Sequence, residues 1–228
     1  GTDWISVCDG SVVTTPPPFL TTQVASDNSG GTYTFLNHNL GADTSLDPHT
    51  PVVGLQGAYI QWGKRGPNTP SGDSTLDWQT AANDGSLGFA SAPTVGSATP
   101  GTWASAETNN DAWNVDENNP IKTANDPCPT GYRVPTRIEW QAVNTNNANS
   151  LTGAAWSAGP TEFGNALHYG PDANGKLLTL PAAGSRSRTN GALNERGNTG
   201  DYWSSTERGD NAYSLYFGSS SVAPAEFS

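Results

Sequence analysis

The stretch Cys128-Pro-Thr-Gly-Tyr-Arg-Val-Pro-Thr-Arg-Ile-Glu-Trp140 is the most informative part of the sequence for the fold. Thr136 is followed three residues later by Glu139, which is the pattern of a capping box. In that motif the hydroxyl and the carboxylate each accept a hydrogen bond from a backbone N–H of the first helical turn. The proline before Thr136 keeps the chain extended up to the cap. A short helix is therefore predicted at 137–144, with an apolar stripe formed by Ile138, Ala142 and Val143.

The composition indicates a fold rich in ordered loops. Hydrophobic residues make up 34% of the 228 residues, and there are 26 glycines and 17 prolines. Eight Trp, seven Tyr and six Phe supply much of the bulk for a core. A chain of this length can bury a substantial core, so we expect a compact, loop-rich domain rather than a helical bundle.

The net charge of −11 argues against nucleic acid and anionic membranes as partners, because both repel an acidic protein. No apolar run approaches the ~18 residues that would suggest a membrane span, so no direct membrane insertion is expected. The sequence contains no Met and no signal segment, which favours a processed piece of a larger extracellular protein.

The two cysteines, Cys8 and Cys128, belong to no Cys/His metal pattern. In a secreted protein, a single disulfide between them is the simplest arrangement, and it would close a long loop. Two free, buried thiols are the alternative, and spacing alone does not decide between them.

Alternating and apolar runs predict several strands, at 4–8, 33–36, 176–184 and 212–217. In the last of these, Leu215 and Phe217 should face the core, while Ser214 and Tyr216 face the other way. The long polar segment 67–125 is interrupted by aromatic residues, so we expect it to pack against the domain. These aromatic residues are Trp78, Phe89, Trp103 and Trp113.

Catalytic motifs are weak. The three histidines, His38, His49 and His168, accompany no Gly-x-Ser-x-Gly elbow, so a catalytic triad is not expected. Acidic residues that could form a glycosidase pair are common on so acidic a chain, and solvated surface is the preferred interpretation. These residues are Glu107, Asp111, Asp116, Glu117 and Glu139.

An ordered set of short segments resembles bacterial C-type-lectin-like domains of the Fibrobacter succinogenes major paralogous domain family, which are related to retroelement-diversified variable proteins. Each segment is weak alone, but their order is specific. They are Asn37-His-Asn-Leu-Gly-Ala-Asp43, Gly57-Ala-Tyr-Ile-Gln-Trp-Gly63, Asp126-Pro-Cys-Pro129, Gly131-Tyr-Arg-Val-Pro-Thr136, Glu139-Trp140 and Tyr202-Trp-Ser-Ser205.

The resemblance implies an α+β fold of the C-type-lectin-like kind, with a small twisted antiparallel sheet, few short helices and extensive ordered loops. It implies an N-terminal strand and proline-rich connector at 1–18, followed by one domain at 19–228. The expected role is that of an extracellular ligand-binding or adhesive module of a bacterial or phage surface protein. It would recognise a protein, peptide or glycan on another cell or surface, and it would not be an enzyme.

In the variable relatives, the ligand-contacting positions follow the Tyr-Trp-Ser-Ser element. Tyr, Ser, Asn and Asp dominate here, as in antibody paratopes, although loops use the same residues. The arginines at 186, 188 and 196 form a basic cluster, for which pairing with the chain's own carboxylates is preferred over ligand binding. The predicted ligand-binding residues are Trp203, Thr206, Glu207, Arg208, Asp210, Asn211, Ser214, Tyr216, Ser219 and Ser220.

Calcium is an open alternative. Oxygen ligands are plentiful at 43–47 and 111–118, but neither segment has EF-hand spacing. The Glu-Pro-Asn and Trp-Asn-Asp signatures of sugar-binding C-type lectins are also missing. A structural Ca²⁺ is therefore compatible with the sequence, whereas calcium-bridged sugar binding is not favoured.

The chain departs from the family at its end, because members usually close with a strand that carries a cysteine. The segment Trp4-Ile-Ser-Val-Cys8 has the same alternation and the same trailing cysteine. We expect it to take the place of the missing strand, within the chain or in a neighbouring copy, with Cys8 bridged to Cys128. A truncated chain is the alternative.

Strand exchange suggests a second role, as a subunit of a surface filament or assembly of copies of itself. A distant third role is that of a formylglycine-generating type of enzyme. Those enzymes use active-site cysteines late in the domain, whereas in this chain no Cys follows Cys128.

Overall fold

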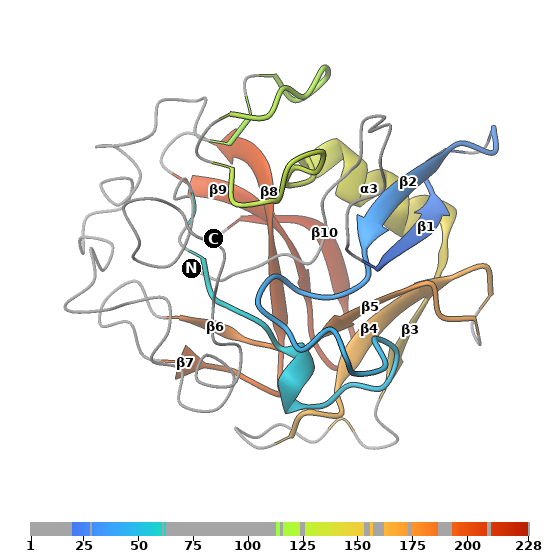
Figure 1. Ribbon diagram of the computed structural model, residues 1–228, viewed down its shortest axis with the longest axis vertical. Helices are drawn as coiled ribbons and strands as arrows, with labels where there is room; N and C mark the ends of the chain where they lie inside the picture. Colours follow the sequence, from blue (N-terminus) through green and yellow to red (C-terminus); the bar gives the residue numbers. More distant parts are fainter. Residues whose placement is uncertain are drawn as a thin grey trace.

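The computed structural model describes residues 20–27, 29–60, 62, 113–114, 116–123, 126–152, 156, 162–172, 175–186, 193–208 and 211–227. Small antiparallel sheets and one α-helix make up its regular structure, as expected for an α+β protein (Figure 1). The predicted strand at 4–8 and three of the four aromatic residues of 67–125 fall outside these ranges. In the described residues, no helix is long and apolar enough to cross a membrane.

The largest strands form the sheet β10-β9-β8, which runs through the middle of the molecule (Figure 1). Its strands are β8 (Gly200–Arg208), β9 (Asn211–Phe217) and β10 (Val222–Phe227). All neighbours are antiparallel, and irregularities interrupt the register between Trp203 and Glu207 and between Ala223 and Glu226. The predicted strand at 212–217 is confirmed as part of β9.

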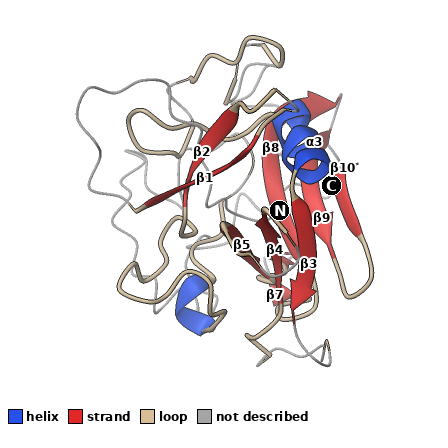
Figure 2. Ribbon diagram, turned by 90° about the vertical axis from the view of Figure 1, so that its right-hand side faces the viewer, coloured by secondary structure: helices blue, strands red, loops and turns tan. Residues whose placement is uncertain are grey.

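A second sheet, β3-β4-β5, lies beside the first (Figure 2). It contains β3 (Ala148–Thr152), β4 (Ala166–Gly170) and β5 (Leu178–Pro181). Strand β4 is buried at every position, since it is the central strand of this sheet. The predicted apolar strand at 176–184 corresponds to β5, which is shorter than expected.

Two short hairpins and a single turn of 3-10 helix complete the described elements. Strands β1 (Thr21–Ala25) and β2 (Thr32–Leu36) form one hairpin, and β6 (Ser185–Arg186) pairs with β7 (Leu193–Asn194). The 3-10 turn η1 covers Val53–Leu55.

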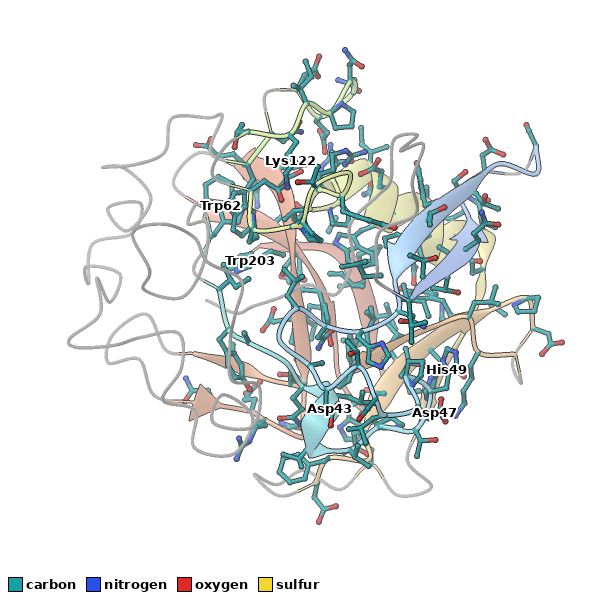
Figure 3. The ribbon with its side chains drawn as sticks, in the orientation of Figure 1. Asp43, Asp47, His49, Trp62, Lys122 and Trp203 are labelled. Atoms are coloured by element: carbon teal, nitrogen blue, oxygen red, sulfur yellow. The ribbon has the colours of Figure 1, made fainter. Side chains whose placement is uncertain are left out.

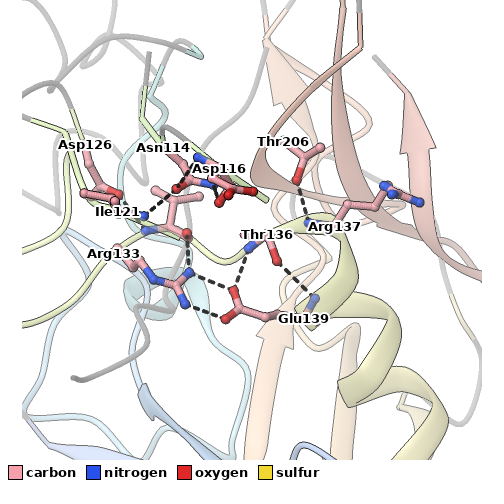
Figure 4. Close-up of polar contacts among 10 residues, drawn as sticks. Asn114, Asp116, Ile121, Asp126, Arg133, Thr136, Arg137, Glu139 and Thr206 are labelled. Atoms are coloured by element: carbon pink, nitrogen blue, oxygen red, sulfur yellow. Dashed lines mark hydrogen bonds and ion pairs between the residues drawn. The ribbon is translucent and has the colours of Figure 1, made fainter. Parts of the chain in front are cut away.

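The predicted capping box is confirmed. Helix α3 (Arg137–Asn146) begins after Thr136, whose hydroxyl accepts a hydrogen bond from the N–H of Glu139 at 3.2 Å. The Glu139 carboxylate accepts the N–H of Thr136 at 2.7 Å and also binds the guanidinium of Arg133 (Figure 4). Because Glu139 is 7% exposed, this ion pair fixes the start of the helix inside the protein.

The segment before the helix is held by the carboxylate of Asp126, which is 2% exposed. It accepts hydrogen bonds from the N–H groups of Cys128 and Val134, both at 2.8 Å, and from Nζ of Lys122 at 2.7 Å. These bonds connect both ends of the 126–134 turn to one buried side chain. The predicted Cys8–Cys128 disulfide involves a residue outside the described ranges, so it remains a prediction.

Tryptophan indoles join the helix, the segment before residue 63 and strand β8. Trp140 donates to the carbonyl of Trp203 at 3.1 Å, and Trp203 donates to the carbonyl of Ile60 at 3.1 Å. Trp62, which is labelled near Trp203 in Figure 3, donates to the carbonyl of Ser204 at 2.9 Å. Two of these three bonds satisfy carbonyls of β8 at the start of the stretch where its register with β9 is interrupted, so the irregular strand is held in the core.

Trp113 is fully buried and packs against Trp62, with their ring centroids 5.6 Å apart. This confirms, for one of the four aromatic residues of the segment 67–125, the expectation that they pack against the domain.

Candidate ligand-binding surface

Cross-strand pairing decides which predicted ligand-binding residues share a face of the sheet. Trp203 pairs with Ser214, and Asp201 pairs with Tyr216, so these four side chains lie on one face. Trp203 and Ser214 are each 1% exposed. The expected burial of Leu215 and Phe217 is confirmed, but the expectation that Ser214 is displayed is wrong, because this face is also covered where it carries Trp203.

Thr206 links parts of the structure and is hardly accessible, at 9% exposed. Its hydroxyl accepts the backbone N–H of Arg137 at 2.9 Å, which gives the helix start a further partner (Figure 4). The same hydroxyl donates to Oε1 of Glu117 at 3.0 Å. Thr206 therefore connects strand β8, helix α3 and the segment 116–123.

The end of the β8–β9 hairpin presents charged and aromatic side chains. Arg208 is exposed and Glu207 is partly exposed. The guanidinium of Arg208 lies 5.8 Å from the ring centroid of Tyr213, and that of Arg137 lies 5.0 Å from the same ring. At these distances both cations are attracted to the π-system of the ring.

Arg137 is oriented by a bidentate ion pair with Glu117, in which both N···O distances are 2.9 Å. These hydrogen bonds raise the pKa of Arg137, so its charge is permanent. We call Glu117, Arg137, Arg208 and Tyr213 the hairpin-end cluster. Glu207 pairs with Ala212 and therefore lies on the other face of the hairpin. The sequence pattern did not identify Tyr213 or Arg137 as surface residues, because the interrupted register of β8 and the fold of the preceding loop bring them together.

The remaining predicted residues lie elsewhere or outside the description. Ser219 and Ser220 are exposed in the turn between β9 and β10. This turn is at the other end of the seven-residue strand β9, roughly 20 Å from the hairpin end at about 3.3 Å per residue. Asp210 is outside the described residues, and Asn211 is placed only as backbone of β9. The predicted set thus forms two separate surfaces.

Tyr216 and Asp201 lie nearer the β9–β10 turn, and both are partly buried. The pKa of Asp201 is raised to about 6, mainly by burial, with smaller contributions from the carboxylates of Glu195 and Glu226, and the hydrogen bond from Ser214 opposes the shift. Ser214 donates a long hydrogen bond of 3.4 Å to Oδ1 of Asp201. Burial also raises the pKa of Tyr216, and the nearby carboxylates of Glu195, Asp201 and Glu226 act in the same direction.

The oxygen-rich segments proposed for calcium use their carboxylates in local turns. Asp43 accepts hydrogen bonds from the N–H and the hydroxyl of Ser45 at 3.0 and 2.7 Å. Asp47 accepts the N–H of His49 at 3.0 Å and the hydroxyl of Thr50 at 2.7 Å. These bonds lower the pKa of both carboxyls. Within the described ranges, no three His, Cys, Asp or Glu side chains are grouped as a metal site would require.

The three histidines all contact other polar groups. The ring of His38 is within 2.7 Å of Oδ1 of Asn37 and 3.0 Å of the carbonyl of Leu46. His49 and His168 both contact the hydroxyl of Thr179. This is an imidazole–hydroxyl arrangement, but Thr179 is 3% exposed, so a substrate has no access to it.

The acidic residues considered for a glycosidase pair and the arginines of the basic cluster have structural contacts where they are described. Glu139 acts in the capping box and Glu117 binds Arg137, while Glu107 and Asp111 lie outside the described residues. In the basic cluster, Arg196 lies 5.3 Å from the ring centroid of Phe163. The side chain of Arg186 and the whole of Arg188 are not described.

No family model, curated protein or solved structure matches this chain.

Proposed function

We propose that this chain is a C-type-lectin-like recognition module, displayed outside a bacterial cell or phage. It binds its ligand non-covalently and catalyses no reaction on it. The ordered motifs that resemble this fold support the proposal, because they contribute core residues of the structure. Tyr202 and Trp203 are buried in β8 and share one hydrophobic cluster with Ile60 and Trp62. Tyr59 is buried as well. A rigid core with long loops is the kind of scaffold on which recognition surfaces are built.

The hairpin-end cluster carries the proposal. It combines an exposed guanidinium, a partly exposed carboxylate and a phenol ring on the end of a strand pair whose base is held by the tryptophan bonds. Aromatic and arginine side chains contribute strongly to binding because they offer large contact areas with few rotatable bonds. The ligand is a protein, peptide or glycan on another cell or surface.

Binding of the full 228-residue chain to glycan and peptide arrays would identify a ligand. Arg208→Ala should then weaken binding at least tenfold, which is about 1.4 kcal/mol, because it removes an exposed contact. Its melting temperature should stay near that of the parent chain, since Arg208 is exposed.

The matched control is Ser219→Ala, which alters the turn at the other end of β9. Unchanged binding by Arg208→Ala together with loss of binding by Ser219→Ala would contradict the hairpin-end assignment and would transfer the site to the β9–β10 turn. Binding that neither variant alters would contradict both surfaces.

A second candidate is a structural role in a surface assembly. In the described part of the chain, β10 pairs with β9 on one side and forms an edge of its sheet. Such an edge can accept a strand from a neighbouring copy, as proposed for residues 1–18. Deleting residues 1–13 should convert an assembly into monomers in light scattering, whereas a monomeric parent chain would contradict this role.

A further inference from the structure

One edge of the Arg137 guanidinium is not used by the contacts that hold this side chain. Glu117 binds Nε and Nη2, both at 2.9 Å, and these two nitrogens form one edge of the guanidinium plane. A guanidinium has a second edge at its end, where Nη1 and Nη2 present parallel N–H groups. Among the described residues, none bonds to Nη1 of Arg137. Arg137 therefore retains a two-pronged donor, which we call its end edge.

The guanidinium is fixed in place by its neighbours. Its partner Glu117 is itself held, because Oε1 of Glu117 accepts the hydroxyl proton of Thr206 at 3.0 Å. The ring centroid of Tyr213 lies 5.0 Å from Cζ of Arg137. Figure 4 shows the side chain of Arg137 pointing away from Arg133 and Glu139, the ion pair at the helix start. A ligand that binds the end edge therefore meets a donor that loses little rotamer freedom on binding.

The surroundings of the end edge are accessible and positively charged. The side chain of Arg137 is 29% exposed, and that of Glu117 is 20% exposed. Arg208 is exposed, and its guanidinium lies 5.8 Å from the same Tyr213 ring. Two guanidinium groups thus accompany one carboxylate in the hairpin-end cluster. The cluster has one net positive charge on a chain whose net charge is −11, so an anionic group is its complement.

A carboxylate is the anion that fits best. Its two oxygens match the parallel N–H groups of a guanidinium edge. It also carries a single charge, which balances the net charge of the cluster. A phosphate group carries close to two negative charges and would leave one of them uncompensated on an acidic protein.

The charge of the whole chain and the residues near Arg137 favour a peptide over an acidic glycan as the source of the carboxylate. A polyanionic glycan would be repelled by the chain's net charge of −11. Ile138, the next residue of the helix, is 38% exposed, and Ile121, in the segment that carries Glu117, is 53% exposed. Apolar side chains of a peptide can pack against such residues, whereas the surface of a glycan consists mostly of hydroxyl groups.

We propose that the end edge of Arg137, with Arg208 beside it, binds the carboxylate of an Asp or Glu side chain in an acidic peptide segment of the partner. This inference rests on the proposed recognition role and names the class of ligand for the hairpin-end cluster. Glu117 is a positioning residue, because it occupies the other edge of the guanidinium and leaves the end edge for the ligand.

Two peptide arrays, identical except that every Asp and Glu of the first is Asn or Gln in the second, test the carboxylate with the unmutated 228-residue chain. The amide form of each bound peptide should bind at least about tenfold more weakly, because it lacks the charge and one of the two acceptor oxygens. This comparison does not depend on the folding of any variant.

Arg137→Lys tests the end edge itself. Lysine keeps the positive charge and can still pair with Glu117, but an ammonium has no planar fork for a second carboxylate. The variant should weaken binding of the acidic peptides about tenfold and alter binding of their amide forms less than about twofold. Lys176→Gln is the matched control, since it removes an exposed positive charge beside β5, in the other sheet. It should leave the binding of both sets of peptides unchanged.

The outcomes separate this inference from the proposed function. Equal binding to both arrays, together with weaker binding by Arg208→Ala, would overturn the carboxylate site and leave the recognition role intact. Binding of uronic-acid glycans but of no acidic peptide would overturn the peptide as partner. If Lys176→Gln weakened binding as much as Arg137→Lys, the overall charge rather than the end edge would be responsible. Absence of binding on every peptide and glycan array would instead contradict the proposed function.

Discussion

The indoles of Trp62 and Trp203 each donate a hydrogen bond to a backbone carbonyl in the segment that contains the other tryptophan. Trp62 donates to the carbonyl of Ser204 at 2.9 Å, and Trp203 donates to the carbonyl of Ile60 at 3.1 Å. Both side chains are at most 2% exposed. Two segments that are more than a hundred residues apart are therefore joined by a reciprocal pair of buried bonds, and the packing of each ring depends on the other segment.

Trp203→Phe should destabilise the protein by about 2 kcal/mol, because it removes both the indole N–H and part of a filled volume. Urea denaturation would measure the change. Trp156→Phe is the control, since its indole also donates to a carbonyl, that of Asn198 at 2.9 Å, but the ring is only partly buried. An equal loss for both variants would contradict the special role of the reciprocal pair.

Gly57→Ala should be strongly destabilising, by about 3 kcal/mol or more. Gly57 has a φ of +72°, and an added Cβ would lie 2.6 Å from the carbonyl oxygen of Leu40 and 2.7 Å from Cβ of Asn39. Gly30→Ala separates the cost of the backbone conformation from the cost of the steric clash. Gly30 has a φ of +88°, but an added Cβ there would meet open space. It should cost only about 1 kcal/mol, and thermal or urea melts that rank the two variants the other way would refute the steric argument.

Asp126→Asn should cost about 3 to 4 kcal/mol, because the amide cannot accept all three hydrogen bonds that the carboxylate accepts. Lys122→Met should cost less, since the side chain of Lys122 is 31% exposed and that of Asp126 is fully buried. A double-mutant cycle of the two would give their coupling energy. If the cycle gave no coupling, the buried ion pair would not contribute to stability.

Asp201→Asn should stabilise the protein at neutral pH, by at most about 3 kcal/mol. The pKa of Asp201 is raised from 3.8 to about 6, so its contribution to stability is fully present below pH 3.8 and is lost as the pH rises through 6. The gain from the amide should therefore be seen at pH 7.5 and should vanish near pH 4. Urea melts at the two pH values would show this, and a stabilisation that does not depend on pH would point to another cause.

Non-reducing peptide mapping should find Cys8 linked to Cys128, as the resemblance to C-type-lectin-like domains implies. Reduction should lower the free energy of unfolding by about 4 kcal/mol, because the bond closes a loop of more than a hundred residues. A Cys8→Ser chain provides the control, since reduction should leave its stability unchanged. Two free thiols in the untreated protein would contradict the pairing.

Local signals in the sequence predicted local structure well. The Thr136–Glu139 pattern located the start of α3 correctly, and alternation identified the core residues Leu215 and Phe217. Strands β3 and β4 were missed, because β4 is buried at all its positions and β3 is polar, so neither alternates.

The candidate surface was harder to predict than the fold elements. Ser214 alternates with core residues, yet it is buried because its cross-strand neighbour Trp203 brings the segment before residue 63 onto the same face. The meeting of Arg137, Tyr213 and Arg208 depends on long-range packing and on an interruption of strand register. Periodicity contains no information on either of these.

The interruption of register in β8 also has a mechanical consequence. Where β8 leaves its ladder with β9, the carbonyls of Trp203 and Ser204 accept indole hydrogen bonds, and the N–H of Ser205 donates to the carbonyl of Pro135 at 2.7 Å. The middle of the hairpin is thus fixed to the core, and its end, at Arg208, projects beyond these hydrogen bonds. Residues added or exchanged beyond these hydrogen bonds would change the length and chemistry of the hairpin end while the buried part of β8 keeps its contacts.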